Sequence, residues 1–194
     1  MKNGWHGSVE TLCAEIASEA LVREKLHRSS YYRYKRLLNC FQLPLIAVSA
    51  INAAFQFLSK NYPKYEDTII TFTGATSVLV SIMTSVQSFL KIGENSATHA
   101  KAHTEWASLY NCIRSQLVLA PSLRTEGSEF LQQIKADFKQ LTEFSPLPGK
   151  DAVAQVKKAI ESSKHPDFRV PATLNGFSAI DVYNEESSYD ENSV

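Results

Sequence analysis

The chain of 194 residues carries no excess of either charge, because 20 Lys and Arg residues balance 20 Asp and Glu residues. A dedicated nucleic-acid-binding protein is usually strongly basic, so this balance argues against that class. Three cysteines, far apart and odd in number, fit a reducing compartment better than a disulfide framework. Seven glycines and seven prolines exclude collagen-like and other low-complexity chains.

Motifs of the common enzyme classes are also lacking. The chain has no glycine-rich phosphate loop, no G-x-S-x-G motif and no H-E-x-x-H motif. We therefore expect a protein that is not an enzyme and binds no cofactor. His99 and His103 stand four residues apart on a predicted helix, with Glu105 nearby, which is a spacing that can hold a metal. Because no third ligand is evident, we expect no metal and keep the two histidines as weak candidates.

The most informative absence is that of charge from two long stretches. Residues 37–58 and 68–90 contain no charged side chain over 22 and 23 residues. At about 1.5 Å of rise per residue, a helix of either length crosses a hydrocarbon core of about 30 Å. A soluble helix normally carries charge on its wet face every turn or two. The pattern predicts two membrane spans; a buried soluble hairpin is the alternative, because the second stretch is rich in Ser and Thr.

The linker over residues 59–67 is short and polar, so the two spans are expected to form an antiparallel hairpin. The 15-residue flanks outside the spans carry eight Lys and Arg residues, against two in the linker. This bias predicts a multi-pass membrane protein with both termini in the cytosol. Residues 1–36 are polar and amphipathic, so no signal peptide is expected.

Aromatic and basic residues are interleaved directly before the first span, over residues 28–36. Such a mixture could bind nucleic acid through phosphate contacts and base stacking. Its position beside a charge-free stretch favours the membrane interface instead, so no nucleic acid is expected as a partner. The side chains expected at the interface are Tyr31, Tyr32, Arg33, Tyr34, Lys35, Arg36, Tyr62, Tyr65 and Lys91.

Apolar residues at helical spacing predict four helices outside the spans, over residues 8–36, 91–120, 125–144 and 151–163. The second of these continues from the second span, with Gly93 as the expected interruption. Because each apolar face needs a cover, we expect the helices to pack as a cytosolic bundle. The predicted fold is all-α, a two-transmembrane helical hairpin with long helices extending into this bundle.

The predicted organisation has four parts. They are an N-terminal cytosolic helix over 1–36, the transmembrane hairpin over 37–90, the cytosolic bundle over 91–165 and a disordered acidic tail over 166–194. The last 17 residues contain five acidic residues and no Lys or Arg. Such a tail is typical of a solvated linker, and binding to a protein partner is the alternative.

Polar residues inside the spans recur at helical spacing, so each span carries one polar stripe. One interpretation is that the stripes line a water-filled path in an oligomer, and the other is that they hydrogen-bond between the two helices. Uncompensated amides in hydrocarbon are costly, which favours the first interpretation for the larger side chains. The pore-lining candidates are Gln42, Ser49, Asn52, Gln56, Thr73, Ser77, Ser81, Thr84 and Ser88.

The layout resembles the SLATT domain family over about residues 8–163. The resemblance rests on the stretch YYRYKR before the first span, the short-looped hairpin, HAKAHTEWASLYNCIRSQL after the second span, and EFLQQIKADFKQLTEFSPLPG. The ending Leu141-Thr-Glu143-Phe-Ser-Pro146-Leu-Pro148 is its most telling part. The resemblance implies a two-transmembrane domain with a cytosolic helical part whose members oligomerise and permeabilise membranes. It implies no catalytic residue.

We therefore expect an integral membrane protein that forms an oligomeric pore or channel, with the lipid bilayer and further copies of itself as partners. A viral or defence effector is the role that the resemblance implies. The alternative is a non-enzymatic structural or scaffold protein of a virion or organelle membrane, whose bundle and tail bind partners.

Overall fold

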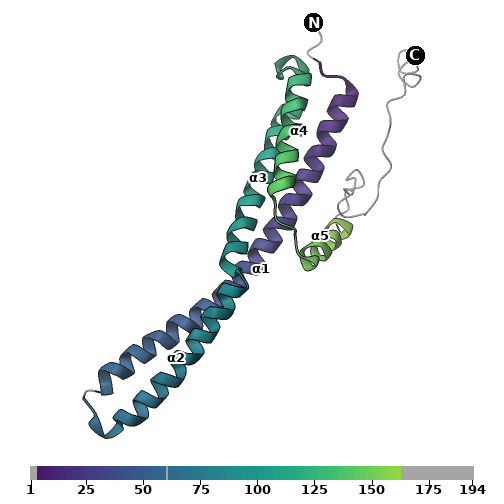
Figure 1. Ribbon diagram of the computed structural model, residues 1–194. Coiled ribbons are helices and arrows are strands. Elements are labelled where there is room, and N and C mark those ends of the chain that lie inside the picture. Colours follow the sequence, from purple (N-terminus) through teal and green to yellow (C-terminus); the bar gives the residue numbers. More distant parts are fainter. Residues whose placement is uncertain (1–3, 60, 163–194) are drawn as a thin grey trace, which may run out of the picture.

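The computed structural model describes residues 4–59 and 61–162, and the predicted acidic tail over 166–194 lies outside them. The described residues form five α-helices and two short 3-10 helices, with no strand among them. The predicted all-α fold is therefore confirmed. Figure 1 shows an elongated molecule, with a two-helix hairpin at one end and a helical bundle at the other.

The first helix, α1, runs from Gly7 to Ser59 without interruption over 53 residues. At about 1.5 Å per residue it is about 80 Å long. Its first half lies in the bundle and its second half in the hairpin, so one helix joins the two regions (Figure 1). The helix continues through Pro44, although this residue has no backbone hydrogen to donate.

The hairpin is closed by a tight turn. The 3-10 helix η1 (Pro63–Tyr65) follows α1, and α2 then runs from Glu66 to Phe89, antiparallel to α1. The turn is shorter than the linker expected over 59–67, because α1 extends to Ser59 and α2 begins at Glu66. Glu66 and Asp67 occupy the first turn of α2, where negative charge favours a helix N-terminus.

The interruption between α2 and the next helix, α3 (Ile92–Val118), lies at Lys91 and not at Gly93 as expected. Lys91 adopts a left-handed conformation with φ of 47°, and its N–H donates to the Ser88 carbonyl at 3.1 Å. Gly93 lies inside α3 with ordinary helical geometry. The expectation was wrong because glycine allows a helix to break but does not require it. The break lies instead at the first residue after the charge-free stretch.

The bundle consists of the first half of α1, α3 and α4 (Gly127–Phe144), with the 3-10 helix η2 (Pro121–Leu123) before α4. Its core has Trp106 and Ile113 of α3 at its centre, both fully buried. The core residues are Cys13, Ala17, Ala20, Ala102, Trp106, Leu109, Ile113, Phe130 and Ile134. Three small residues of α1 thus face the large residues of α3, which permits close packing of these two helices.

Helix α5 (Lys150–Ser162) lies against α1 at the end of the bundle nearest the hairpin (Figure 1). Val156 packs on Val22 and Leu26 in a second, smaller core cluster. Ser29 of α1 also donates from Oγ to Gln155 Oε1 at 2.6 Å. The two contacts fix α5 close to the residues that precede the charge-free half of α1.

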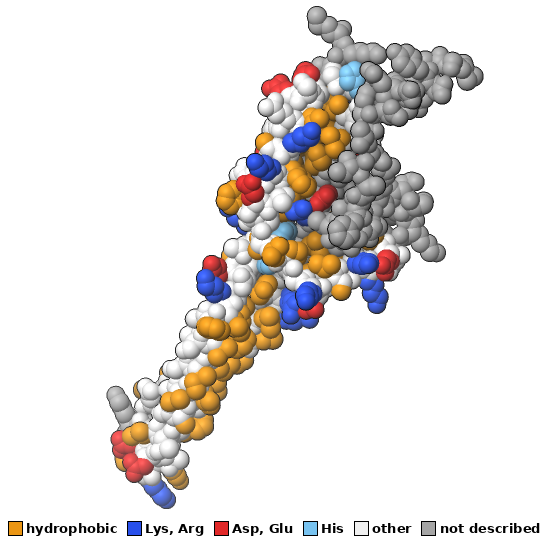
Figure 2. Space-filling model, turned by 45° about the vertical axis from the view of Figure 1, so that its right-hand side comes forward, with side chains coloured by type: hydrophobic (Ala, Val, Ile, Leu, Met, Phe, Trp, Pro, Cys, Tyr) orange, Lys and Arg blue, Asp and Glu red, His pale blue; other side chains and the backbone are white. Residues whose placement is uncertain are grey.

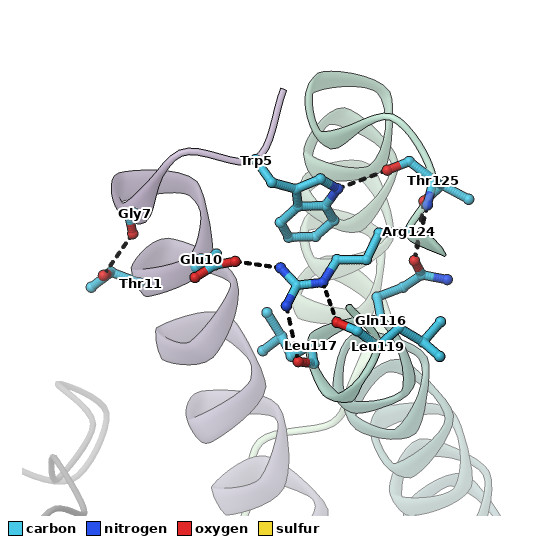
Figure 3. A network of polar contacts seen from close by, with 9 residues as sticks. All are labelled: Trp5, Gly7, Glu10, Thr11, Gln116, Leu117, Leu119, Arg124 and Thr125. Carbon is cyan, nitrogen blue, oxygen red and sulfur yellow. Dashed lines mark hydrogen bonds and ion pairs between the residues drawn. The ribbon is translucent and has the colours of Figure 1, made fainter. Parts of the chain in front are cut away.

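The far end of the bundle is closed by polar contacts around Arg124 (Figure 3). The guanidinium pairs with Glu10 of α1 and donates from Nε to the Leu119 carbonyl at 2.8 Å. It also lies 4.8 Å from the ring of Trp5, whose indole donates to the Thr125 carbonyl at 2.7 Å. These contacts tie the start of α1 to the α3–α4 connection, so the bundle is fastened at the end opposite the hairpin.

Candidate functional site: the exposed hairpin and the histidine junction

The hairpin leaves most of its apolar surface without a protein cover. In the most apolar stretch of each long helical segment, only 6% of the residues are buried. A core helix of a soluble protein would be mostly buried, so the expected alternative of a buried soluble hairpin does not fit this chain on its own. Large side chains exposed by more than half include Leu43, Ile46, Phe57, Val78 and Phe89. Both segments are long and apolar enough to cross a membrane.

Two of the pore-lining candidates, Asn52 of α1 and Thr73 of α2, are buried in the seam between the helices. Asn52 accepts a hydrogen bond through Oδ1 from the Thr76 hydroxyl at 2.7 Å. Thr73 Oγ1 donates to the Ile69 carbonyl of its own helix at 2.9 Å. Of these two candidates, Asn52 makes a hydrogen bond across the seam, and Thr73 bonds within its own helix. Both are buried, unlike the other members of their stripes.

The other stripe members are exposed on the surface of the hairpin: Gln42, Ser49, Gln56, Ser77, Ser81, Thr84 and Ser88. Successive residues of a helix are about 100° apart around its axis. On this basis the α1 stripe is rotated from the seam by roughly a fifth of a turn and the α2 stripe by roughly a quarter of a turn, each in the direction in which its own helix winds. The two helices are antiparallel and wind in opposite directions when seen from one end, so the two stripes face the same side of the hairpin. In the view of Figure 2, hydrophobic side chains run along one edge of the hairpin, and the other edge shows mainly backbone and side chains that are neither hydrophobic nor charged.

The residues expected at the membrane interface lie at the two ends of the hairpin. Tyr62 and Tyr65 are exposed at the turn, and Lys91 is exposed at the other end, where α2 meets the bundle. Tyr32, Arg33, Lys35 and Arg36 are exposed where α1 leaves the bundle. Tyr31 and Tyr34 are half-buried instead, because their rings pack against α3.

A buried histidine pair joins α1 to α3 directly above the hairpin. His27 and His99 are each 3% exposed, and their Nδ1 atoms lie 3.0 Å apart. One ring must therefore carry a proton on Nδ1 and donate it to the Nδ1 lone pair of the other ring. The two histidines cannot both be positively charged in this contact, because then both Nδ1 atoms would carry a proton. The Tyr34 ring stacks on His99 at 5.5 Å between centroids, which covers the pair on the hairpin side.

The surroundings of the pair disfavour its charged form. Burial, together with the nearby His99, Arg23 and His103, lowers the pKa of His27 to about 4. Burial likewise lowers the pKa of His99. Glu24 lies 4.0 Å from the neighbouring His103 and also pairs with Lys25 at 3.2 Å and with Arg28 at 3.8 Å. We call His27, His99 and the adjoining His103, Tyr31 and Tyr34 the histidine junction.

The predicted pair of His99 and His103 is divided between two environments. His99 faces His27, whereas His103 is half-buried, 6.0 Å from the Tyr31 ring and 4.0 Å from Glu24. Within residues 4–59 and 61–162, no group of three or more His, Cys, Asp or Glu residues gathers as a metal site. The sequence reasoning missed His27. Its place at helical spacing between Ala20 and Tyr34, on the face turned to α3, was the available signal.

Comparison with known proteins adds no relative: no family model, no curated protein and no solved structure matches the chain.

Proposed function

We propose that the protein inserts the hairpin into a membrane, with both termini on the cytosolic side, and assembles with further copies into a non-enzymatic water-filled pore. The observation that carries this proposal is the two-sided surface of the hairpin, which is free of charge yet polar along one side and apolar along the other. The apolar side suits lipid. The polar side includes Gln42 and Gln56, whose amides would lack partners in hydrocarbon.

One hairpin has too few helices to enclose water, so the polar sides of several copies must face a common axis. This arrangement gives the amides water or neighbouring copies as partners and leaves the apolar edge to the lipid. The resemblance to the SLATT domain family supports the same function, and a membrane-permeabilising effector is the role that follows from it.

The test is release of a small dye from liposomes containing the purified protein. We expect release from the unaltered chain, and we expect the double variant Gln42→Leu plus Gln56→Leu to reduce it tenfold or more, because the lining becomes apolar and dewets. The matched control is Gln132→Leu plus Gln140→Leu, which alters two exposed glutamines of α4 and should leave release unchanged. A monomer in mild detergent, together with absence of dye release, would overturn the pore and favour the scaffold alternative.

A further inference from the structure

A cleft between α1 and α5 opens at the level where the charge-free half of α1 begins. It has a volume of about 720 Å³ and is lined by the basic side chains Lys25, Arg28, Arg33 and Arg36 of α1. The one acidic residue on its described wall is Asp151 of α5, which pairs with Arg33. Figure 2 shows basic side chains gathered at this level, where the hairpin meets the bundle. The cleft therefore has the charge to hold an anion.

The two ends of the cleft differ in chemistry. Helix α5 begins beside Arg33, since a Cβ on Gly149 would lie 3.6 Å from the Arg33 guanidinium. The hairpin side of the cleft is therefore basic. At the other end Val22 and Val156 belong to the small core cluster that docks α5. We call the hairpin end of the cleft, with Arg33 and Arg36, its mouth. It lies at the level where the headgroups of a membrane around the hairpin would lie.

A shallow groove continues from this mouth along α1 towards the hairpin. It shares Tyr32 and Arg36 with the cleft and runs past Asn39 and Cys40 to Leu43 and Pro44. An anion at the mouth would thus sit at the head of an apolar track along the first charge-free stretch. Basic side chains followed by such a track match a molecule with an anionic head and a hydrocarbon tail.

We propose that the cleft mouth and the groove together bind one anionic phospholipid of the leaflet adjoining the bundle. Arg33 and Arg36 hold its phosphate, and an acyl chain lies along Leu43 and Pro44. The ion pair of Arg33 with Asp151 is solvent-exposed, with 55% of the Arg33 side chain and 73% of the Asp151 side chain accessible. Exposed ion pairs are weak, so Asp151 competes only weakly with a phosphate group for Arg33. This inference rests on the membrane insertion proposed above, but it does not depend on pore formation.

The test uses the full chain in mild detergent and titrates it with dioleoyl phosphatidylglycerol, dioleoyl phosphatidylcholine and glycerol 3-phosphate. We expect the anionic lipid to bind at least tenfold more tightly than the zwitterionic lipid and than the soluble phosphate. The double variant Arg33→Gln plus Arg36→Gln should lose tenfold or more of this affinity, whereas Asp151→Asn should gain about twofold, because a competing anion is removed.

The matched control is Lys135→Gln plus Lys139→Gln, which removes two exposed positive charges from α4 and should leave lipid affinity unchanged. Arg33→Lys plus Arg36→Lys retains the charge and should recover part of the affinity, which separates charge loss from misfolding. Equal binding of the two lipids would overturn the proposal, as would glycerol 3-phosphate binding as tightly as the anionic lipid. If the anionic lipid binds selectively only after residues 166–194 are removed, the proposal is overturned, because that acidic segment and not a lipid then occupies the cleft in the full chain.

The failures of the two proposals are distinguishable. A protein that binds the anionic lipid selectively but releases no dye from liposomes refutes the pore and retains the lipid site. A protein that releases dye but binds both lipids equally refutes the lipid site and retains the pore.

Discussion

In the bundle, α3 buries the large apolar side chains of Trp106 and Ile113 against α1, whereas the two buried residues in the described part of the hairpin are the polar Asn52 and Thr73. Many of its large apolar residues, such as Ile46 and Phe57, are exposed, and those in the seam, such as Phe55, are half-buried. The same helix, α1, therefore follows two opposite patterns along its length. In water, burial of apolar surface drives helices together, but between lipid-facing helices this force is absent and polar contacts and close packing remain. The contrast supports lipid as the surroundings of the hairpin.

The histidine junction lies where these two patterns meet. It contains polar side chains, as the hairpin seam does, yet its residues are buried as in the bundle core. The four predictions that follow test this division of the molecule, from the largest expected effect to the smallest.

Trp106→Ala should unfold the bundle and leave the hairpin helical. Trp106 is fully buried in the main core cluster, and its indole donates to Ser145 Oγ at 2.9 Å. Removal of such a side chain costs about 3–5 kcal/mol of unfolding free energy. Near-ultraviolet circular dichroism and limited proteolysis in detergent would measure the loss. The control Phe144→Ala, at a residue 79% exposed, should change stability by less than about 0.5 kcal/mol. Simultaneous loss of the hairpin helices would refute the independence of the two regions.

A charge on the exposed hairpin surface should prevent membrane insertion, although the same charge in the exposed connection between α4 and α5 should be harmless. Ile46 is 65% exposed and Leu147 is 92% exposed. If the first residue faces lipid and the second faces water, Ile46→Lys costs about 3 kcal/mol of insertion free energy. Leu147→Lys should cost less than about 0.5 kcal/mol. Resistance to alkaline extraction from microsomes would report insertion, and equal behaviour of both variants would contradict a lipid-facing hairpin.

Mild acid should loosen the junction between the two regions. The pKa of His27 lies at about 4 in the folded chain, below the 6.5 of an ordinary histidine. Between these two pH values the unfolded chain binds more protons than the folded chain. The unfolding free energy is therefore highest above about pH 7 and falls as the pH drops from 6.5 towards 4. The total loss should be about 2–3 kcal/mol.

Thermal unfolding between pH 7.5 and 5 would measure this dependence. The variant His27→Gln should be less stable at pH 7.5 but should show a flatter pH profile, because the titrating group has been removed. The exposed His6 supplies a control, since His6→Gln should retain the steep profile. An identical slope in the His27 variant would exclude the pair as the source of the acid sensitivity.

Much of this architecture can be read from the sequence, because it depends on local patterns. The charge-free stretches and the apolar spacing at Trp106 and Ile113 fix where the helices lie and which face is buried. Which polar residues meet could not be predicted in this way. His27 and His99 are 72 residues apart, and their contact depends on the register of α1 against α3, which no local pattern encodes. The same holds for Asn52, because a stripe on one helix does not define where the partner helix lies.

The smallest effect should come from the seam of the hairpin. In a double-mutant cycle of Asn52→Ala and Thr76→Val, the hydrogen bond between these residues at 2.7 Å should contribute about 0.6 kcal/mol of coupling. The amount is small because an opened hairpin in lipid can offer both groups other partners. The comparable cycle of Trp106→Phe and Ser145→Ala in the bundle should give about 1 kcal/mol. Unfolding in bicelles would supply both values, and a seam coupling well above that of the bundle would mean that polar contacts, and not the fit of the two helices, hold the hairpin together.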